Sequence, residues 1–332
     1  MAAAGAGGAA GGPRAGAPAG SGGVAGGGGG GRAARAVRWA LATEAWEPGE
    51  EEWAFLLSLL PAEEAEDVRR FRREEDRKRA LGSRVMQRAC IQRVAGVPWR
   101  EAEIARTKGR KPFLRAPHRE PDLGLPNFNF NVSHEGHYVV LASESVCVVG
   151  VDVAAPAQVR PRGGGEEMGL AELRDTFGGQ LTEQEWQAVA SSGGDAQARN
   201  AFQRYWSCKE AFVKARGDGL GFELKRCEFF FEGGPDTYIA HVKVDGRREP
   251  AWRLFLQRLG EHWVTVARGP PQDVVDAHGE FMASLQRRDF AREEWDQELN
   301  APSPPFVPVN IADMLPKDVR GEYIERFDDS PF

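Results

Sequence analysis

The stretch that most constrains this chain runs from Phe202 to Lys214 and has the apolar spacing of a helix. Apolar side chains recur at every third or fourth position and form one stripe: Phe202, Tyr205, Trp206, Phe212 and Val213. Glu210 and Lys214 are four residues apart, so they share a helix face beside this stripe. The pattern predicts a carboxylate and an ammonium at the edge of a buried helix, although an exposed ion pair of little energetic value has the same spacing.

The first 36 residues differ in composition from the rest of the chain, because they are almost entirely Gly, Ala, Pro and Arg. Such a segment has little apolar surface to bury, so we expect residues 1–36 to form a disordered leader. No acidic residue precedes Glu44, which is typical of an organellar transit peptide, but the leader has a single serine and no amphipathic period. We expect a cytoplasmic protein, with import into a plastid or mitochondrion as the alternative.

Charge and cysteine spacing argue against several other classes of protein. The net charge of −6 disfavours a general nucleic-acid binder but leaves room for a local basic pocket. No run reaches the roughly 18 apolar residues of a membrane span, so we expect no membrane partner. The cysteines have neither C-x-x-C nor metal-type spacing, so we expect reduced thiols in the core: Cys90, Cys147, Cys208 and Cys227.

The first half of the chain is expected to contain helices and strands in alternation. Alternating apolar residues predict a strand at 37–42, and helical patterns cover 50–60 and 62–94. Strands at 138–143 and 147–153 are expected to form a hairpin around Glu144 and Ser145. We assign residues 37–153 to an N-terminal half.

The second half, residues 154–268, is expected to run from helices to strands. Thr182 and Glu185 have the spacing of a helix capping box. The main helix with Glu210 and Lys214 ends at Gly217, since glycine tolerates a left-handed conformation. Four alternating segments then predict an antiparallel meander: 227–231, 238–244, 252–259 and 263–267. Residues 269–332 form an extension with a helix at 290–299 and an extended Pro302–Pro305, and their role is unknown.

Two segments of the first half carry polar groups in unusual settings. The turn from Arg106 to Lys111 has four cations around Gly109, so it is either an ordinary exposed turn or a flexible phosphate clamp. Ser133 and His134 end an alternating strand, but without a third group they are weak support for a hydrolase triad.

Asp152 interrupts a strand that is otherwise apolar on both faces. Burying a carboxylate is costly unless it is paired or binds a cation. From this residue alone, a structural salt bridge and a metal ligand both remain open.

Three segments, Phe128–His134, Gly150–Val153 and Trp206–Lys214, together resemble the Sfp-type 4′-phosphopantetheinyl transferases. The resemblance covers residues 37–268 and is strongest to the eukaryotic group that includes aminoadipate-semialdehyde dehydrogenase phosphopantetheinyl transferase. It implies an α+β fold, a pseudo-dimer of two similar α/β halves with coenzyme A and Mg²⁺ in the cleft between them. It also implies transfer of the phosphopantetheine arm of coenzyme A to a serine of an acyl- or peptidyl-carrier domain, with release of 3′,5′-ADP.

The resemblance also implies roles for individual residues. Asp152 and Glu210 would hold Mg²⁺, and Lys214 would contact a phosphate or order the incoming serine. Residues implied to contact coenzyme A are Arg79, Arg106, Lys108, Lys111, Asn131, Ser133, His134 and Lys214. Such oxygen ligands suit Mg²⁺, and much of the catalysis would be positioning and preset charge.

The sequence departs from the family pattern at three positions. Ala154 stands where many members have a second acid, so water or another group would complete the metal shell. Glu135 stands where close relatives have glutamine, so either Glu135 or Glu210 is the general base, or Glu135 is a third carboxylate near the metal. Asp67 stands where relatives carry a cation for coenzyme A, and Arg69 or Arg70 is the expected substitute.

Two other functions fit part of this pattern. The chain could be a non-catalytic module that binds coenzyme A or carrier proteins, or a metal-dependent phosphohydrolase acting on coenzyme A. For the transferase, the acceptor stays open among fatty-acid synthase carriers, mitochondrial or plastid acyl carriers and aminoadipate-type reductases. Two halves in one chain would form a complete cleft, so we expect a monomer.

Overall fold

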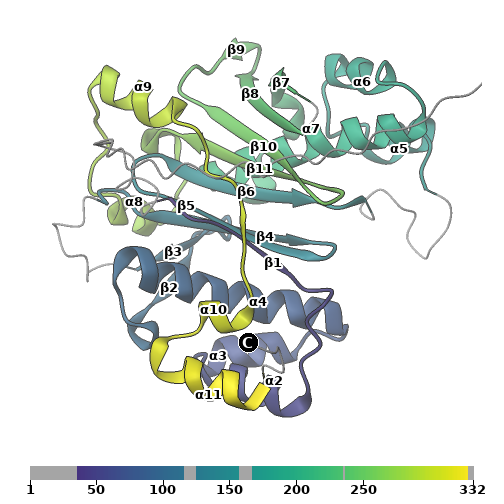
Figure 1. The fold of residues 1–332 in the computed structure, drawn as a ribbon. Coiled ribbons are helices and arrows are strands. Elements are labelled where there is room, and N and C mark those ends of the chain that lie inside the picture. Colours follow the sequence, from purple (N-terminus) through teal and green to yellow (C-terminus); the bar gives the residue numbers. More distant parts are fainter. Residues whose placement is uncertain (1–35, 116–124, 157–166, 235, 328–332) are drawn as a thin grey trace, which may run out of the picture.

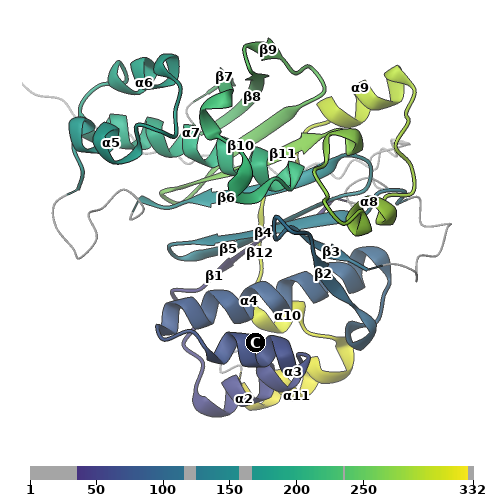
Figure 2. The ribbon, with the colours of Figure 1, turned by 180° about the vertical axis from the view of Figure 1, so that it is seen from behind.

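Two β-sheets lie face to face at the centre of the molecule, and helices cover the outer side of each (Figure 1). This computed structural model describes residues 36–115, 125–156, 167–234 and 236–327. The predicted disordered leader lies outside the described residues apart from Ala36. The arrangement confirms the expected α+β fold of two similar halves, each with one sheet and one long helix packed on it (Figure 2).

The first half has a sheet with the strand order β12-β1-β5-β4. The long helix α4 packs on it because Leu81, Val85 and Met86 recur at helical spacing and are fully buried. The elements of this half are β1 (Arg38–Ala42), α2 (Glu50–Ser58), α3 (Ala62–Arg69), α4 (Glu74–Cys90), β2 (Ile104–Arg106), β3 (Pro112–Leu114), β4 (Asn129–Glu135) and β5 (Tyr138–Glu144). A π-helical turn, Ile91–Ala95, and a 3-10 turn, Trp99–Glu101, follow α4.

The second half has a sheet with the order β6-β11-β10-β8-β7, and β9 pairs with β8. Its strands confirm the predicted meander, and Thr182 and Glu185 form the predicted capping box. The elements are β6 (Val148–Ala154), α5 (Leu170–Phe177), α6 (Glu183–Ala190), α7 (Asp195–Arg216), β7 (Cys227–Gly233), β8 (Thr237–Val244), β9 (Arg247–Arg248), β10 (Arg253–Leu259) and β11 (His262–Gly269), with 3-10 turns Gly219–Gly221 and Leu224–Arg226. Helix α7 ends as predicted at Gly217, which has φ +85°.

The predicted hairpin of residues 138–143 and 147–153 is wrong. β5 pairs with β4 and β1, whereas β6 pairs with β11 in the other sheet. Strand β6 is apolar on both faces because α7 covers one face and the first sheet covers the other. The division of the chain after Val153 remains a prediction, while the backbone pairing places β6 in the second sheet.

The predicted helical region 62–94 is helical and consists of two α-helices, α3 and α4, followed by the π-helical turn. Helix α3 ends at Arg69, and α4 begins at Glu74 after Arg73 adopts an extended backbone with ψ 140°. The break lets α3 fold back against α4, which buries Ala65 and Val68. A single continuous helix would leave this face of α3 in solvent.

The C-terminal extension returns from the second half to the first. It contains a 3-10 turn, Pro271–Asp273, and the elements α8 (Glu280–Ser284), α9 (Arg292–Asn300), β12 (Val307–Pro308), α10 (Ile311–Met314) and α11 (Lys317–Phe327). The sequence predicted α9 and the extended prolines after it. Strand β12 pairs in parallel with β1, and α10 packs against α4. In the part of the chain that the structure describes, no helix has both the length and the apolar character needed to cross a bilayer.

Candidate functional site

Gly150 allows helix α7 to lie directly on strand β6. A Cβ atom at Gly150 would come within 2.1 Å of the Ala211 carbonyl oxygen and 2.4 Å of the Ala215 nitrogen. Only glycine tolerates so close an approach. Asp152 is two residues further along the strand, so its side chain points to the same face. The sequence therefore brings Asp152 under the helix that carries Glu210 and Lys214.

Asp152 is a buried carboxylate with one oxygen engaged and the other without a partner. Its Oδ1 accepts hydrogen bonds from Lys214 Nζ at 2.6 Å and from Ser133 Oγ at 3.1 Å. Its Oδ2 is buried and has no hydrogen-bond partner among the described residues. Burial raises the pKa of Asp152, and the Lys214 ammonium opposes this effect. An orphaned buried oxygen is costly, and a bound cation would relieve that cost.

Glu210 lies one helical turn before Lys214 and close enough to Asp152 to repel it. Burial, followed by the charge of Asp152, raises the pKa of Glu210, while Lys214 lowers it. The Glu210 side chain is half-buried. Two neighbouring carboxylates and a single lysine leave excess negative charge at this position, which suits a divalent cation.

Three side chains of β4 take the place of a backbone ladder between the two sheets. Each accepts a hydrogen bond from a backbone nitrogen of β6, and alternate residues do so because strand side chains alternate between faces. The pairs are Asn129 Oδ1 with Val149 at 2.8 Å, Asn131 Oδ1 with Val151 at 2.9 Å and Ser133 Oγ with Val153 at 3.4 Å.

Two of the predicted coenzyme A contacts, Asn131 and Ser133, belong to this ladder but have different surroundings. Asn131 is buried, and its side-chain oxygen is occupied by Val151, so its place is structural. Ser133 is also buried but sits at the last rung, where it touches Asp152 and Lys214. Of these two residues, therefore, only Ser133 contacts Asp152 and Lys214.

The turn between β4 and β5 holds Glu135 beside this cluster. Arg79 of α4 donates to the Gly136 carbonyl oxygen at 2.7 Å and to Asp76 at 2.6 Å, which ties the helix to the turn. Burial raises the pKa of Glu135, and the neighbouring Arg79 opposes it. Asp152 also acts on this pKa, so Glu135 lies within electrostatic reach of the predicted metal ligands.

His134 precedes this turn and is neutral at physiological pH. Desolvation by surrounding atoms, then the charges of Lys214 and Arg79, lower its pKa to about 4, although His134 as a whole is an exposed residue. His134 can thus offer a ring nitrogen to a ligand without adding charge.

Three guanidinium groups of the first half, those of Arg84, Arg106 and Arg110, form a cluster. Burial, followed by the charges of Arg84 and Arg110, lowers the pKa of Arg106, which places the three groups close together. The Arg84 Nε is buried without a hydrogen-bond partner among the described residues. Arg84 was not among the predicted site residues, because nothing in the sequence distinguishes it from the other arginines of its helix. Lys108, in the same turn as Arg106, is exposed.

Lys111 does not lie where a phosphate could reach it. The side chain is buried and donates to the carbonyl oxygens of Val149 and, at 3.3 Å, Lys214. Burial lowers the pKa of Lys111 to about 7. The structure therefore gives Lys111 the role of joining the basic turn to β6 and α7, and does not support a direct contact with coenzyme A.

The cations expected to substitute for the one missing at Asp67 are engaged on the surface of α3. Arg70 pairs with Asp67 at 3.1 Å, and Arg69 lies 3.8 Å from Glu66. All four side chains are more than half exposed, so these pairs contribute little to stability. A ligand could displace them, and their role stays a prediction.

Among the described residues, two carboxylates, those of Asp152 and Glu210, are available to bind a metal ion, and no third one joins them. Among the residues that the structure describes, no group of three or more His, Cys, Asp or Glu side chains could hold a metal ion. The orphaned Asp152 Oδ2 and the neighbouring Glu210 carboxylate fit a hard cation that would take its other ligands from water and a bound diphosphate.

Comparison with known families agrees with this geometry. Residues 44–146 match the model described as 4′-phosphopantetheinyl transferase, N-terminal, and residues 148–267 match the 4′-phosphopantetheinyl transferase superfamily. The two matches meet between β5 and β6, where the chain passes from one sheet to the other. The chain belongs to the 4′-phosphopantetheinyl transferase superfamily, and it is an enzyme of the transferase class.

Individual relatives cover most of the two halves. The L-aminoadipate-semialdehyde dehydrogenase-phosphopantetheinyl transferase of Mus musculus is 33% identical over 241 residues, which cover 71% of this chain and 75% of the relative. A phosphopantetheinyl transferase of a Thraustochytrium species is 37% identical over 69% of this chain and 77% of its own. A 4′-phosphopantetheinyl transferase of Bacillus subtilis is 29% identical over 60% of this chain and 73% of its own.

Proposed function

We propose that this enzyme moves the 4′-phosphopantetheine arm of coenzyme A onto a serine of an acyl- or peptidyl-carrier domain, with Mg²⁺ held by Asp152 and Glu210. The observation that carries the proposal is the buried Asp152, whose Oδ1 is held by Lys214 and Ser133 while its Oδ2 has no partner. This set of groups gathers charge at one point between the halves. It suits a diphosphate substrate.

The reaction is a displacement at the phosphorus that bears the pantetheine arm. The serine oxygen forms a new P–O bond, the bond to the bridging oxygen of the diphosphate breaks, and 3′,5′-ADP leaves with that oxygen. The serine proton passes to a base of the enzyme. Asp152 and Glu210 would hold Mg²⁺, which when bound would supply positive charge that offsets the charge of the diphosphate. Lys214 adds a second positive charge at the same place, preset by its contact with Asp152.

Glu135 is the base that the local environment favours. Its pKa is raised by burial, which brings a carboxylate closer to the range where it can take a proton near neutral pH. Glu210 also has a raised pKa, but a carboxylate that holds a metal is a poor proton acceptor. In this proposal Glu210 is a ligand and Glu135 is the base.

The guanidinium cluster binds the phosphates of coenzyme A. Arg84 and Arg106 of this cluster, together with Arg79 of α4, present planar groups that suit phosphate oxygens, and Arg84 has an unpartnered buried Nε. Neutral His134 of β4 and exposed Lys108 of the turn that follows Arg106 would complete the contacts.

The direct test is mass spectrometry of an apo carrier domain after incubation with enzyme, coenzyme A and Mg²⁺. The expected result is a gain of one phosphopantetheine mass on the carrier and none on a carrier whose acceptor serine is alanine. Omission of Mg²⁺ with a chelator present should abolish the gain. A panel of carriers that all stay unmodified would overturn the proposal.

The same experiment distinguishes the two other functions. A binding module would retain coenzyme A or the carrier in a binding assay without any mass change. A phosphohydrolase would release phosphopantetheine in a reaction that contains no carrier. The panel contains fatty-acid synthase, organellar acyl-carrier and aminoadipate-type reductase domains, and the relative rates identify the acceptor.

The role of Glu135 has its own test, the pH profile of Glu135→Gln. Loss of the base should lower kcat and remove the acidic limb of the profile, whereas Mg²⁺ affinity should change little. Full turnover at every pH would exclude the base role.

We also propose that the enzyme is a monomer in the cytoplasm, with organelle import as the alternative. A fluorescent fusion of residues 1–45 that stays diffuse would remove the import alternative.

A further inference from the structure

The extension that follows the family match crosses between the two halves as an extended strap, residues 301–309. Helix α9 lies beside the second sheet, whereas α10 packs against α4 on the far side of the first sheet and α11 contacts α10 and α2 (Figure 1). The strap contains Pro302, Pro304 and Pro305, which fix φ and make an extended segment stiff. Both family matches end before it, the later one at residue 267.

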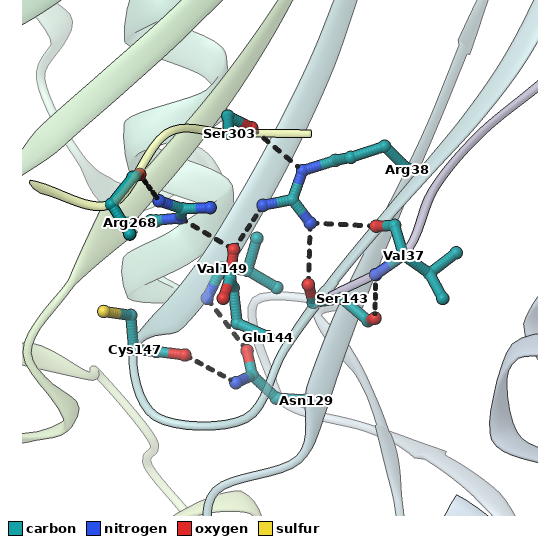
Figure 3. Close-up of polar contacts among 10 residues, drawn as sticks. Val37, Arg38, Asn129, Ser143, Glu144, Cys147, Val149, Arg268 and Ser303 are labelled. Atoms are coloured by element: carbon teal, nitrogen blue, oxygen red, sulfur yellow. Dashed lines mark hydrogen bonds and ion pairs between the residues drawn. The ribbon is translucent and has the colours of Figure 1, made fainter. Parts of the chain in front are cut away.

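A buried ionic cluster fastens the strap at the junction of the halves (Figure 3). Glu144 of β5 accepts hydrogen bonds from Arg38 of β1 and from Arg268 of β11, at 2.7 Å in the second case. The two arginine side chains are 0% and 1% exposed. The strap supplies further acceptors: the Ala301 carbonyl oxygen for Arg268 at 2.6 Å, and Ser303 Oγ for Arg38 at 3.3 Å. Each half contributes one arginine, so the strap closes a network that spans both.

Phe306 of the strap packs into the apolar layer between the two sheets. It is 8% exposed and belongs to a cluster with Ala40, Val140 and Ala142 of the first sheet. The members of this cluster from the second sheet are Val149, Val151, Val153, Val264 and Val266. The next residue, Val307, pairs with Trp39 of β1 but leaves 53% of its side chain exposed.

The layer that holds Phe306 is continuous with the candidate site. Val151 and Val153 flank Asp152 on β6, and Val140 is directly opposite Ser133 in the pairing of β5 with β4. The contact between Ser133 and Asp152 joins one sheet to the other. Any change in the spacing of the sheets must therefore change this contact.

We propose that the strap sets the spacing of the two halves and that Phe306 is a positioning residue for the site between them. The kinetic part of this inference rests on the proposed transferase function. Removal of the Phe306 ring leaves a cavity between packed sheets, and the sheets relax toward it. Misplacement of reacting groups by about 1 Å can lower a rate by as much as about 100-fold. Phe306 acts on the reaction only through this spacing.

The kinetic experiment compares Phe306→Ala, Phe306→Leu and the matched control Val307→Ala at a temperature far below the unfolding midpoint of each. We expect kcat/KM for coenzyme A to fall about tenfold or more in Phe306→Ala. It should be largely restored in Phe306→Leu and unchanged in Val307→Ala. A purely structural role would lower the unfolding midpoint of Phe306→Ala and leave turnover per folded molecule at the wild-type value, and that result would overturn the proposal.

A second measurement does not depend on activity. Spin labels at Ser58→Cys in α2 and Ser192→Cys in the loop after α6 report the separation of the halves, because both sites are exposed and the native cysteines are buried. Electron–electron resonance should give a shifted or broader distance distribution in Phe306→Ala than in Val307→Ala. Identical distributions would contradict the strap even if the wild-type enzyme proved inactive. An inactive wild type with a shifted distribution would contradict only the transferase function.

Discussion

Lys214 Nζ of helix α7 lies 2.6 Å from Asp152 Oδ1 of strand β6, and the same ammonium lies 2.9 Å from Ser133 Oγ. Lys214 therefore links helix α7 of the second half to Ser133, the last residue of the side-chain ladder on β4 of the first half. It also leaves Asp152 Oδ2 without a partner. The arrangement presets positive charge on one side of the carboxylate and keeps the other side open to a cation.

The first prediction concerns Asp152→Asn and Glu210→Gln. Each change keeps the shape of the side chain and removes one negative charge from the proposed metal position. Loss of an outer partner of a metal ligand costs about 10–100-fold in affinity or activity, so loss of a direct ligand should cost at least that much. The measurement is carrier modification as a function of Mg²⁺ concentration. The control is Glu172→Gln on the exposed face of α5, which should behave as wild type. Wild-type Mg²⁺ dependence in either site variant would remove that residue from the metal.

The second prediction separates neighbouring residues of the main helix. Lys209 precedes Glu210 but points into the core. Its ammonium donates to the backbone carbonyl oxygen of Cys227 at 2.6 Å and forms an ion pair with Glu185 at 2.7 Å. Lys209→Met leaves the buried Glu185 unpaired, so the free energy of unfolding should fall by about 3–5 kcal/mol. Urea unfolding measures this change.

Two further variants make the Lys209 prediction specific. Adding Glu185→Gln to Lys209→Met removes the uncompensated charge, so the double variant should be more stable than Lys209→Met alone. The exposed pair of Arg174 and Glu183, at 2.6 Å, is the matched control, and Arg174→Met should cost less than about 1 kcal/mol. Equal losses in Lys209→Met and Arg174→Met would show that burial of the first pair is unimportant.

The third prediction concerns the ladder that joins the sheets. Asn131→Ala leaves the buried Val151 nitrogen without its acceptor, so the free energy of unfolding should fall by about 1–3 kcal/mol. Asn129→Ala removes another rung of the ladder and should act in the same direction. Urea unfolding and the KM for coenzyme A are measured together. An unchanged stability with a raised KM would instead support the direct coenzyme A contact that the sequence suggested for Asn131.

The residues of the main helix show how far sequence alone could go. The stripe of Phe202 and Phe212, the shared face of Glu210 and Lys214, and the end at Gly217 are local properties of a helix, so spacing predicted them. Asp152 was recognisable because a lone acid in an apolar strand needs a partner. Local patterns of this kind located the centre of the candidate site before any fold was known.

Strand partners and individual cations could not be predicted in the same way. The apolar run predicts a strand at residues 147–153 but does not say that its neighbour is β11, more than 100 residues away, instead of adjacent β5. Side-chain acceptors on Asn129 and Asn131 hold the other edge of β6, and no pairing pattern signals them. Arg84 becomes distinctive only when Arg106 and Arg110 fold over it.

The fourth prediction concerns the pH dependence of stability and Lys111. Its pKa is about 7 in the folded protein, against 10.5 for an ordinary lysine. Between these values the unfolded chain binds more protons than the folded one, so Lys111 makes stability rise with pH, by at most about 1.4 kcal/mol per pH unit. Lys111→Met lacks this term. The free energy of unfolding of wild type relative to Lys111→Met should therefore increase steadily from pH 7.5 to about 9.5.

Urea unfolding at several pH values in this range measures that difference, and the exposed neighbour Lys108 provides the control. Lys108→Met should show the same pH dependence as wild type, since the Lys108 side chain is exposed and is not buried on folding. A constant difference between wild type and Lys111→Met would mean that Lys111 stays charged between the carbonyl groups of Val149 and Lys214. In that case the ammonium would be a candidate phosphate ligand again, because a charged lysine at this position implies access to water or to an anion.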